Sequence, residues 1–253
     1  MGNIVITGAA SGIGLAIAEQ LQREGHRIIG VDIQASDITA DLSTPEGRAA
    51  AVAAIHNATA DGISGLVACA GVGSHVTNNA LITAVNYFGA VELVEGLREH
   101  LAQHRAPVVL VSSNSAPMPT NADFVDSLLD GDFDAACKIA TDMHGQPVYS
   151  GTKQALTRWM RRNTAAYAGQ GVRMNAIAPG YTRTPLSLAA EDDPNFADAI
   201  KKFIGSIPIG RPGEPGDMAD AVSFLLSERA GFICGTMLFI DGGHDAVLRP
   251  DAF

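Results

Sequence analysis

The chain has 253 residues, 47% of them hydrophobic and 17% charged, and its 17 basic and 27 acidic side chains give a net charge of −10. This length and composition predict one substantial folded core and argue against a disordered chain. The negative charge would repel phosphate backbones and anionic lipids, so binding to nucleic acid or to a membrane surface is not expected.

Short β-branched apolar runs alternate with amphipathic stretches along the whole chain. In the amphipathic stretches apolar residues recur at helical spacing, for example in Ile13–Glu24 and Asp217–Ser227. Because the runs are apolar almost throughout, the strands are expected to be covered on both faces. This alternation predicts an α/β fold, a doubly wound parallel sheet in a single domain spanning 1–253. The predicted strands are Asn3–Thr7, Arg27–Val31, Gly65–Cys69, Val108–Ser112, Arg173–Ile177 and Thr236–Ile240.

A glycine-rich turn, Gly8-Ala9-Ala10-Ser11-Gly12-Ile13-Gly14, joins the first predicted strand to the first predicted helix. Glycines let the backbone turn sharply and approach a pyrophosphate, whose charge the free N–H groups and the helix dipole stabilise. Asp32 ends the next strand, where a carboxylate accepts hydrogen bonds from ribose hydroxyls but repels a 2′-phosphate. No Arg or Lys occurs from Thr7 to Ser11 or just after Asp32, so the sequence favours NAD over NADP.

Asn114–Val148 departs from the alternation, because it lies between a predicted strand and the next helix and carries many acidic residues. Apolar residues around Phe124 predict a short helix that ends at Gly131, and those around Phe133 predict a second that ends near Gly145. We therefore expect residues 114–148 to form a helical insertion at the carboxyl edge of the sheet.

Tyr149 and Lys153 are four positions apart, so on a helix their side chains share one face. A nearby ammonium group favours the phenolate and lowers the pKa of a tyrosine from its usual value near 10. Ser113 follows a predicted strand, at the sheet edge where doubly wound folds bind ligands. These three residues indicate acid–base chemistry beside a dinucleotide.

Tyr181–Arg211 is a second irregular stretch, rich in proline and large apolar residues but with little periodicity. It is predicted to be a loop that acts as a substrate lid. Four of its apolar residues keep helical spacing, which is typical of a core helix or of an apolar surface above a ligand. These residues are Phe196, Ile200, Phe203 and Ile204.

Further motifs occur in the same chain order: Ala70-Gly71, Asn86, Pro179-Gly180 and Asp241-Gly242-Gly243. Together the motifs resemble those of the short-chain dehydrogenase/reductase family over essentially the whole chain. The resemblance implies a Rossmann-type fold with Tyr149 as general acid/base and with Lys153 lowering its pKa and holding the nicotinamide ribose. It also implies that Ser113 hydrogen-bonds the substrate oxygen and that Asn86 orders a proton-relay water.

The resemblance implies NAD contacts at further positions. The pyrophosphate would be held by Gly8, Ser11, Gly12, Ile13 and Gly14, and the adenine side would be flanked by Asp41, Leu42, Cys69, Ala70 and Gly71. Tyr149, Lys153, Pro179, Gly180, Thr182 and Thr184 would complete the site, with Thr184 reaching the carboxamide. The family usually has Asn-Asn-Ala-Gly at Ala68-Cys69-Ala70-Gly71, so backbone contacts are expected there without the asparagine side chains that brace the central strands. Ser113 and Tyr149 are 36 positions apart, farther than in most members, because of the insertion.

Within the family, the sequence is most similar to the bacterial 3α-hydroxysteroid dehydrogenase/carbonyl reductases. The shared stretches are Asp41–Arg48, Val85–Ala90, the position of the insertion, and Asp241–Pro250. This implies an NAD(H)-dependent enzyme that interconverts a secondary alcohol and a ketone on a hydrophobic alicyclic substrate, with a 3α-hydroxysteroid/3-ketosteroid pair as leading candidate.

Other functions remain open at this point. The substrate could be a non-steroidal ketone, a cyclic diketone or an acyl-carrier β-ketoester, although the last would favour a basic docking patch. A non-catalytic NAD-sensing protein is the alternative outside enzymes. The complete set of Ser113, Tyr149, Lys153 and Asn86 argues against it, because such proteins tend to lose the tyrosine or the lysine.

The remaining features concern metals, thiols and assembly. His100 and His104 share a helical face, but no third ligand stands out and no metal site is predicted.

The widely spaced Cys69, Cys137 and Cys234 predict buried thiols. Their reduced state, together with the lack of a signal peptide or a membrane-spanning segment, favours a cytoplasmic protein. Apolar residues near Phe232–Ile240 favour a homodimer or homotetramer. In many relatives the tyrosine helix and the helix before it form a dimer seam, which the insertion is expected to change or block.

Overall fold

Seven parallel strands form one sheet in the computed structural model, which describes residues 2–185, 187–188 and 197–252. The spatial order of the strands is β3-β2-β1-β4-β5-β6-β7. The chain adds β2 and β3 on one side of β1, then crosses back to place β4 on the other side of β1, and adds β5, β6 and β7 beyond it. This is the doubly wound topology that the sequence predicts. The strands are β1 (Asn3–Thr7), β2 (Arg27–Asp32), β3 (Ile38–Thr39), β4 (Gly65–Ala68), β5 (Val108–Val111), β6 (Met174–Pro179) and β7 (Met237–Ile240).

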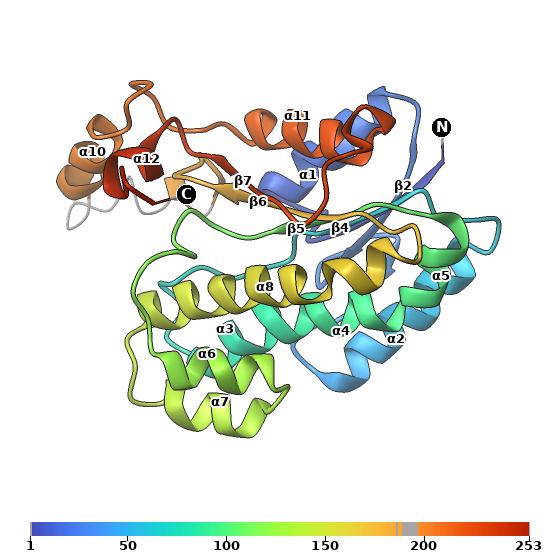
Figure 1. The fold of residues 1–253 in the computed structure, drawn as a ribbon, viewed down its shortest axis with the longest axis horizontal. Helices are drawn as coiled ribbons and strands as arrows, with labels where there is room; N and C mark the ends of the chain where they lie inside the picture. The colour runs from blue at the N-terminus through green and yellow to red at the C-terminus, as the bar shows by residue number, and fades with distance from the viewer. Residues whose placement is uncertain (1, 186, 189–196, 253) are drawn as a thin grey trace.

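Helices cover both faces of the sheet (Figure 1). One face carries α1 (Gly12–Arg23) and α11 (Pro215–Leu226), and the other carries α2 (Pro45–Ala58), α4 (Gly89–Gly96), α5 (Arg98–His104) and α8 (Gly145–Ala168). The remaining helical segments are α3 (Asn79–Thr83), the π-helical turn η1 (Ala84–Phe88), α6 (Ala122–Leu129), α7 (Phe133–Ala140), α10 (Ala197–Gly205), the 3₁₀ turn η2 (Glu228–Ala230) and α12 (His244–Leu248).

The two helical layers give two hydrophobic cores, one on each side of the sheet. Leu66 and Leu110 face the layer of α2, α4 and α8, whereas Val67 and Val109 from the same strands face α1 and α11. Side chains alternate between the faces of a strand, so a strand buried on both sides must be apolar at successive positions. This confirms the predicted class of sheet and explains why its strands show no polar alternation.

The predicted strand ends agree with the structure to within about two residues, and one strand was not predicted. β3 has only Ile38 and Thr39, which is too short to produce a hydrophobic pattern. Cys69 and Ser112 lie just beyond the strands that were predicted to include them. The expectation of three buried thiols is wrong: Cys69 and Cys137 are only half-buried, and Cys234 is exposed in the turn before β7.

The insertion forms a helical hairpin of α6 and α7 beside α3 and α8, at the lower left of Figure 1. The helix α7 ends at Ala140 rather than near Gly145, which is instead the first residue of α8. A side chain from another segment accounts for this earlier end. The amide of Asn79 donates hydrogen bonds to the carbonyls of Ala140 and Met143, both at 2.8 Å, and so satisfies acceptors at the helix terminus.

Part of the predicted lid falls within the described residues. The helix α10 lies inside it, and the ring of Phe203 packs edge-on against Tyr181 at 5.9 Å and His244 at 4.7 Å. Residues 186 and 189–196, including Phe196, and the side chain of Ile200 lie outside the described part of the structure. Phe203 therefore joins the lid region to the start of α12 by aromatic contact.

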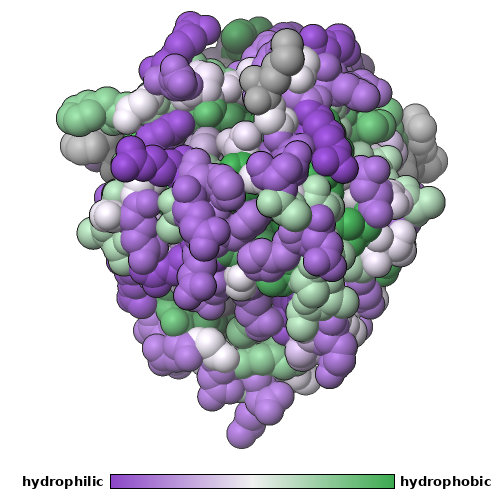
Figure 2. All heavy atoms as spheres, turned by 90° about the vertical axis from the view of Figure 1, so that its right-hand side faces the viewer, coloured by the Kyte–Doolittle hydropathy of each residue, from purple (hydrophilic) through white to green (hydrophobic). Residues whose placement is uncertain are grey.

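The face at the amino ends of the strands, near α5 and the N-terminus, is covered largely by hydrophilic side chains (Figure 2). Among the described residues, no individual helix has both the length and the apolarity to cross a membrane. The pair Asn79–Gly96 and Arg98–His104, bent by 55°, meets those criteria together in length and composition only.

Candidate functional site

A cleft of about 520 Å³ lies at the carboxyl ends of the strands, at the point where the strand order reverses. It brings together the segments that follow β1, β2, β4, β5 and β6, including every residue predicted to contact the cofactor. The predicted residues along the cleft are Gly8, Ser11, Gly12, Ile13, Gly14, Asp32, Asp41, Leu42, Cys69, Ala70, Gly71, Ser113, Tyr149, Lys153, Pro179, Gly180, Thr182 and Thr184. Asn86 is the one predicted site residue that does not line it.

The glycine turn has a backbone shape that other residues would disturb. Gly8 and Gly12 have φ angles of 70° and 55°, in the left-handed region that favours glycine. A Cβ atom on Gly14 would collide with the carbonyl oxygen of Gly8, so the third glycine allows α1 to start directly against the strand end.

The N–H groups at the start of α1 can bind an anion. Ser11 occupies the N-cap position, but its hydroxyl makes no capping hydrogen bond, and the first turn contains no acidic residue. The first N–H groups of a helix have no intrahelical partner, and they carry the positive end of the helix dipole. This end of the cleft therefore fits the pyrophosphate of a dinucleotide.

Asp32 ends β2 and joins it to the glycine turn. Its Oδ2 accepts a hydrogen bond from the N–H of Ala10 at 3.0 Å, and its Oδ1 accepts one from Gln34 at 3.0 Å. These two bonds fix the carboxylate at the wall of the cleft, where each oxygen keeps further acceptor capacity. The arrangement suits vicinal hydroxyl groups and disfavours a phosphate.

The loop after β4 is held without the asparagine side chains usual in the family. The hydroxyl of Thr7 accepts hydrogen bonds from the N–H groups of Cys69 and Ala70, both at 3.0 Å. The side chain of Asn86, in the π-helical turn, accepts from the N–H of Val72 at 2.8 Å and donates to its carbonyl at 2.9 Å. Thr7 and Asn86 thus hold this loop, and the role of Asn86 in ordering a proton-relay water stays a prediction.

Tyr149 and Lys153 share one face of α8, as predicted, and the Lys153 Nζ lies 5.8 Å from the centre of the tyrosine ring. The Lys153 ammonium donates a hydrogen bond to the carbonyl of Val111 at 2.8 Å. The carbonyl end of β5 therefore sets the position of this cation.

The expected lowering of the tyrosine pKa does not appear in the structure. Burial raises the pKa of Tyr149, and a hydrogen bond from the side chain of Ser113 opposes that rise. Burial also lowers the pKa of Lys153 to about 8. The spacing of four in the sequence correctly predicted that Tyr149 and Lys153 share a helix face. It could not show that burial disfavours the charged form of each side chain.

Ser112 holds the tyrosine helix against β5. Its hydroxyl donates to the carbonyl of Lys153 at 3.2 Å and pairs with the hydroxyl of Thr157 at 2.9 Å. The next residue, Ser113, faces the cleft. Of these two consecutive serines, which both line the cleft, Ser112 uses its hydroxyl to hold α8 against β5.

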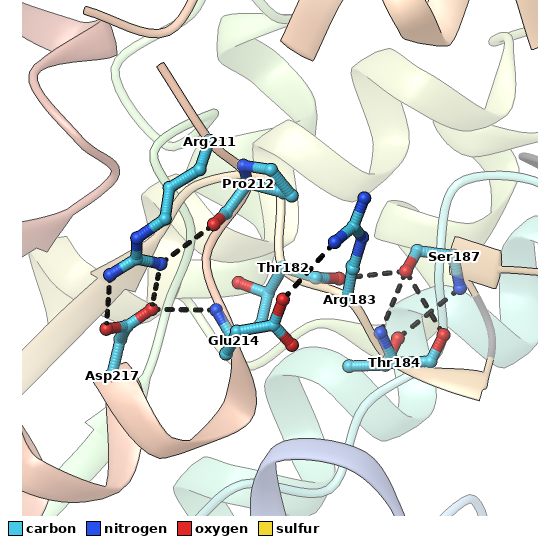
Figure 3. A network of polar contacts seen from close by, with 8 residues as sticks. All are labelled: Thr182, Arg183, Thr184, Ser187, Arg211, Pro212, Glu214 and Asp217. Atoms are coloured by element: carbon cyan, nitrogen blue, oxygen red, sulfur yellow. Dashed lines mark hydrogen bonds and ion pairs between the residues drawn. The ribbon is translucent and has the colours of Figure 1, made fainter. Parts of the chain in front are cut away.

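Thr182 and Thr184 belong to a polar network shown in Figure 3. Ser187 donates to the carbonyls of Thr182 and Thr184 at 2.9 and 3.1 Å and accepts from the N–H of Thr184 at 2.9 Å. Thr184 lies across the cleft from the glycine turn, where its methyl group would be 3.5 Å from a Cβ on Gly12. This segment is held next to the start of α11, since Arg183 pairs with Glu214 at 3.5 Å.

Sequence reasoning missed several residues that line the same cleft, most of them apolar or small. They are Val31, Ile33, Gln34, Ala40, Val72, Gly73, Leu81, Val85, Val111, Ser112 and Pro185. Most directly follow or precede a predicted site residue, so proximity in sequence was the available signal. Leu81 has no such neighbour, because it reaches the cleft from α3, for which no helix was predicted.

Of the two histidines considered as metal ligands, His100 is buried and His104 is exposed, and both make ring contacts. The rings of His100 and His104 meet edge-on at 5.1 Å, His56 lies 4.9 Å from His100, and His100 Nε2 hydrogen-bonds Thr59 at 2.8 Å. Within the described residues, no group of three or more His, Cys, Asp or Glu side chains is placed to hold a metal ion.

Comparisons with known proteins agree with this geometry. The model of the short chain dehydrogenase family matches residues 2–124, and the model described as enoyl-(acyl carrier protein) reductase matches residues 134–245. The chain is 39% identical to a 3-alpha-hydroxysteroid dehydrogenase/carbonyl reductase from Comamonas testosteroni, with both chains covered completely. It is also 30% identical to a galactitol 2-dehydrogenase from Cereibacter sphaeroides, over 94% of this chain and 93% of the relative.

A solved structure shares the fold closely. The 3-alpha-hydroxysteroid dehydrogenase from Pseudomonas sp. B-0831, in complex with NADH, superimposes with a TM-score of 0.94 and is 44% identical. The similarity covers 99% of this chain and all of the other.

Proposed function

Because this chain belongs to the short-chain dehydrogenase/reductase family and is an oxidoreductase of alcohols and ketones, we propose that it acts with NAD(H) on hydrophobic alicyclic secondary alcohols. A 3α-hydroxysteroid and its 3-ketosteroid are the leading substrate pair. One observation carries the proposal: Ser113, Tyr149 and Lys153 meet in a single cleft whose other end is a glycine turn fitted for a dinucleotide.

The cofactor would lie along this cleft, with its pyrophosphate at the start of α1 and its adenosine ribose at Asp32. NAD(H) bound there would supply the hydride acceptor for oxidation of the alcohol and the hydride donor for reduction of the ketone. Asp32 supports NAD over NADP, because a 2′-phosphate beside a carboxylate is unfavourable and Ile33 and Gln34, which follow it, carry no positive charge.

In the proposed mechanism, Tyr149 moves the proton that balances the reaction. During oxidation the tyrosine oxygen takes the hydroxyl proton of the substrate, and during reduction it returns that proton to the carbonyl oxygen. Ser113 donates a hydrogen bond to the same substrate oxygen, where charge develops. Lys153 supplies positive charge next to the phenol and stabilises its deprotonated form.

The preference for an alicyclic substrate rests on similarity and on the apolar residues of the cleft. Val72, Leu81, Val85 and Pro185 offer hydrophobic contact, which suits a ring system better than a polyol. Some relatives act on other substrates, such as the galactitol dehydrogenase. A non-steroidal ketone or a cyclic diketone is therefore the alternative substrate for this chain.

The proposal is tested by following NADH formation at 340 nm with a panel containing androsterone, cyclohexanol and galactitol. We expect androsterone to be oxidised fastest, and we expect Tyr149→Phe to lose nearly all activity while still binding NADH. Tyr167→Phe is a matched control, because it removes a buried hydroxyl without a hydrogen-bond partner from the same helix. The proposal is wrong if the wild type oxidises nothing in the panel or if Tyr149→Phe remains active.

The cofactor assignment gives a separate prediction. Replacing Asp32 by alanine should lower the preference for NAD over NADP, measured as the ratio of kcat/KM values, by at least about tenfold, because the repulsion of a 2′-phosphate is removed. Asp37→Asn is the control, since Asp37 accepts a hydrogen bond from Gly30 on the same strand but does not line the cleft. An unchanged ratio in Asp32→Ala would contradict the assignment.

A further inference from the structure

Ser113 receives two hydrogen bonds from a residue that does not line the cleft. The N–H of Ser115 donates to Ser113 Oγ at 3.1 Å, and the hydroxyl of Ser115 donates to the same oxygen at 3.0 Å. The backbone therefore turns directly after β5, so that Ser115 faces the side chain of Ser113.

These two bonds determine what Ser113 can do with its own proton. A serine hydroxyl has one donor and two acceptor sites, and Ser115 fills both acceptor sites of Ser113. The remaining capacity is the O–H of Ser113, which can only donate. The side chain of Ser113 also opposes the rise that burial causes in the pKa of Tyr149, which is the effect that a donor has on a phenol oxygen.

The turn that holds Ser115 is itself fixed at several points. The N–H of Asn114 donates to the carbonyl of Pro179 at 3.0 Å, which joins the turn to the end of β6. Gln154, on the tyrosine helix, donates to the carbonyl of Ala116 at 2.9 Å. The donor groups of Ser115 are therefore held between β6 and α8 rather than on a free loop.

We propose that Ser115 is a positioning residue that keeps the hydroxyl of Ser113 as a donor toward the reacting oxygen. This rests on the proposed function, because it assumes that Ser113 and Tyr149 act on the substrate. Ser115 contacts neither the substrate nor the cofactor in this account. It acts through the orientation of one hydroxyl, so its effect should depend completely on the presence of Ser113.

The test is a double-mutant cycle with Ser113→Ala, Ser115→Ala and the double variant, assayed with NAD and the alcohol oxidised fastest by the wild type. Ser115→Ala should lower kcat about tenfold, the loss expected when one hydrogen bond near a developing charge is removed, with KM values within about twofold. The pH profile of kcat should move to higher pH, because Tyr149 becomes harder to deprotonate. Ser115→Thr keeps the hydroxyl and should restore both, and Ser115→Cys, a weaker donor, should be intermediate.

In the Ser113→Ala background the second substitution should have no further effect. The proposal is overturned if Ser115→Ala keeps the wild-type kcat and pH profile, or if it reduces kcat further when Ser113 is already absent. Binding of NADH and the melting temperature show whether each variant is folded, and the threonine and cysteine variants decide the matter if the alanine variant is not. Full activity in Tyr149→Phe, or none in the wild type, would instead reject the proposed function and this role with it.

Discussion

Lys153 holds a positive charge at a position that is only 4% exposed. Burial lowers its pKa to about 8, whereas a lysine in an unfolded chain has a pKa near 10.5. The unfolded state therefore binds this proton more tightly, and the free energy of unfolding rises with pH between those two values. Below about pH 8 Lys153 is charged in the folded state, so burial of its ammonium group lowers the free energy of unfolding by the full amount. The charged lysine in the cleft therefore makes the protein less stable at neutral pH.

Lys153→Met should consequently be more stable than the wild type at pH 7, although catalytically inactive. The difference in the free energy of unfolding should shrink as the pH rises from about 8 toward 10.5, because the wild type gains stability over this range and the variant does not. Urea denaturation at pH 7, 8, 9 and 10 measures this difference.

The exposed Lys138, on α7, provides the matched control for that experiment. Lys138→Met makes the same chemical change without releasing a buried charge, so its stability should stay close to that of the wild type at each pH. Parallel stability curves for Lys153→Met and the wild type would show that burial does not shift the titration of Lys153.

Single residues with a defined chemical role were predictable from the sequence, and those that act through local geometry were not. The proximity of Tyr149 and Lys153 follows from a spacing of four on a helix. Ser115 could not be singled out, because its effect on Ser113 depends on how the backbone turns after β5. Ile33 lines the cleft although it is 67% exposed, and nothing in a strand pattern marks such a residue.

Among the elements, the tyrosine helix α8 and the insertion helix α6 pack closely at one glycine. A Cβ atom on Gly151 would lie 2.7 Å from the ring of Phe124 and 3.0 Å from the hydroxyl of Thr120. Phe124 is fully buried, so its ring has little room to move. The glycine between Tyr149 and Lys153 therefore has a packing function, which allows the insertion to lie directly on the catalytic helix.

Gly151→Ala should destabilise the protein by about 1–3 kcal/mol, the usual cost of overpacking a core, despite the better helix propensity of alanine. It should also lower kcat, since any shift of α8 moves Tyr149. Gly216→Ala in α11 is the control, because no atom lies within 4 Å of the added Cβ, and it should leave stability unchanged or raise it by up to about 1 kcal/mol. Thermal and urea unfolding would contradict this packing role if both variants behaved alike.

At the scale of elements, the sequence predicted what hydrophobic periodicity can show. The central strands and α1, α6, α7 and α11 follow from buried apolar runs and helical spacing. The end of α7 did not, because Asn79 sets it from a segment about 60 residues earlier. The two-residue strand β3 is defined by its pairing with β2 rather than by any pattern of its own.

For the whole molecule, the hairpin of α6 and α7 determines which surfaces remain open to association. It packs on α3 and the first half of α8 (Figure 1). Its Phe133 meets Phe88 edge-on at 5.3 Å. We propose that it covers part of the surface formed by α4 and α8, so that any homodimer or homotetramer uses another surface. Removal of the hairpin would expose Phe88 and the side of α8, and exposed apolar patches promote association.

A deletion can test this because the two ends of the hairpin lie close together: the Thr120 hydroxyl donates to the carbonyl of Pro147 at 2.7 Å. Replacing residues 121–144 by a short glycine linker should raise the mass of the particle above that of the wild type, as measured by sedimentation or light scattering. Asp126→Asn, at an exposed position of α6, alters the charge but keeps the hairpin, and its mass should equal that of the wild type. Circular dichroism and NADH binding establish that the deletion variant is folded. An identical mass for that folded variant and the wild type would show that the hairpin does not control assembly.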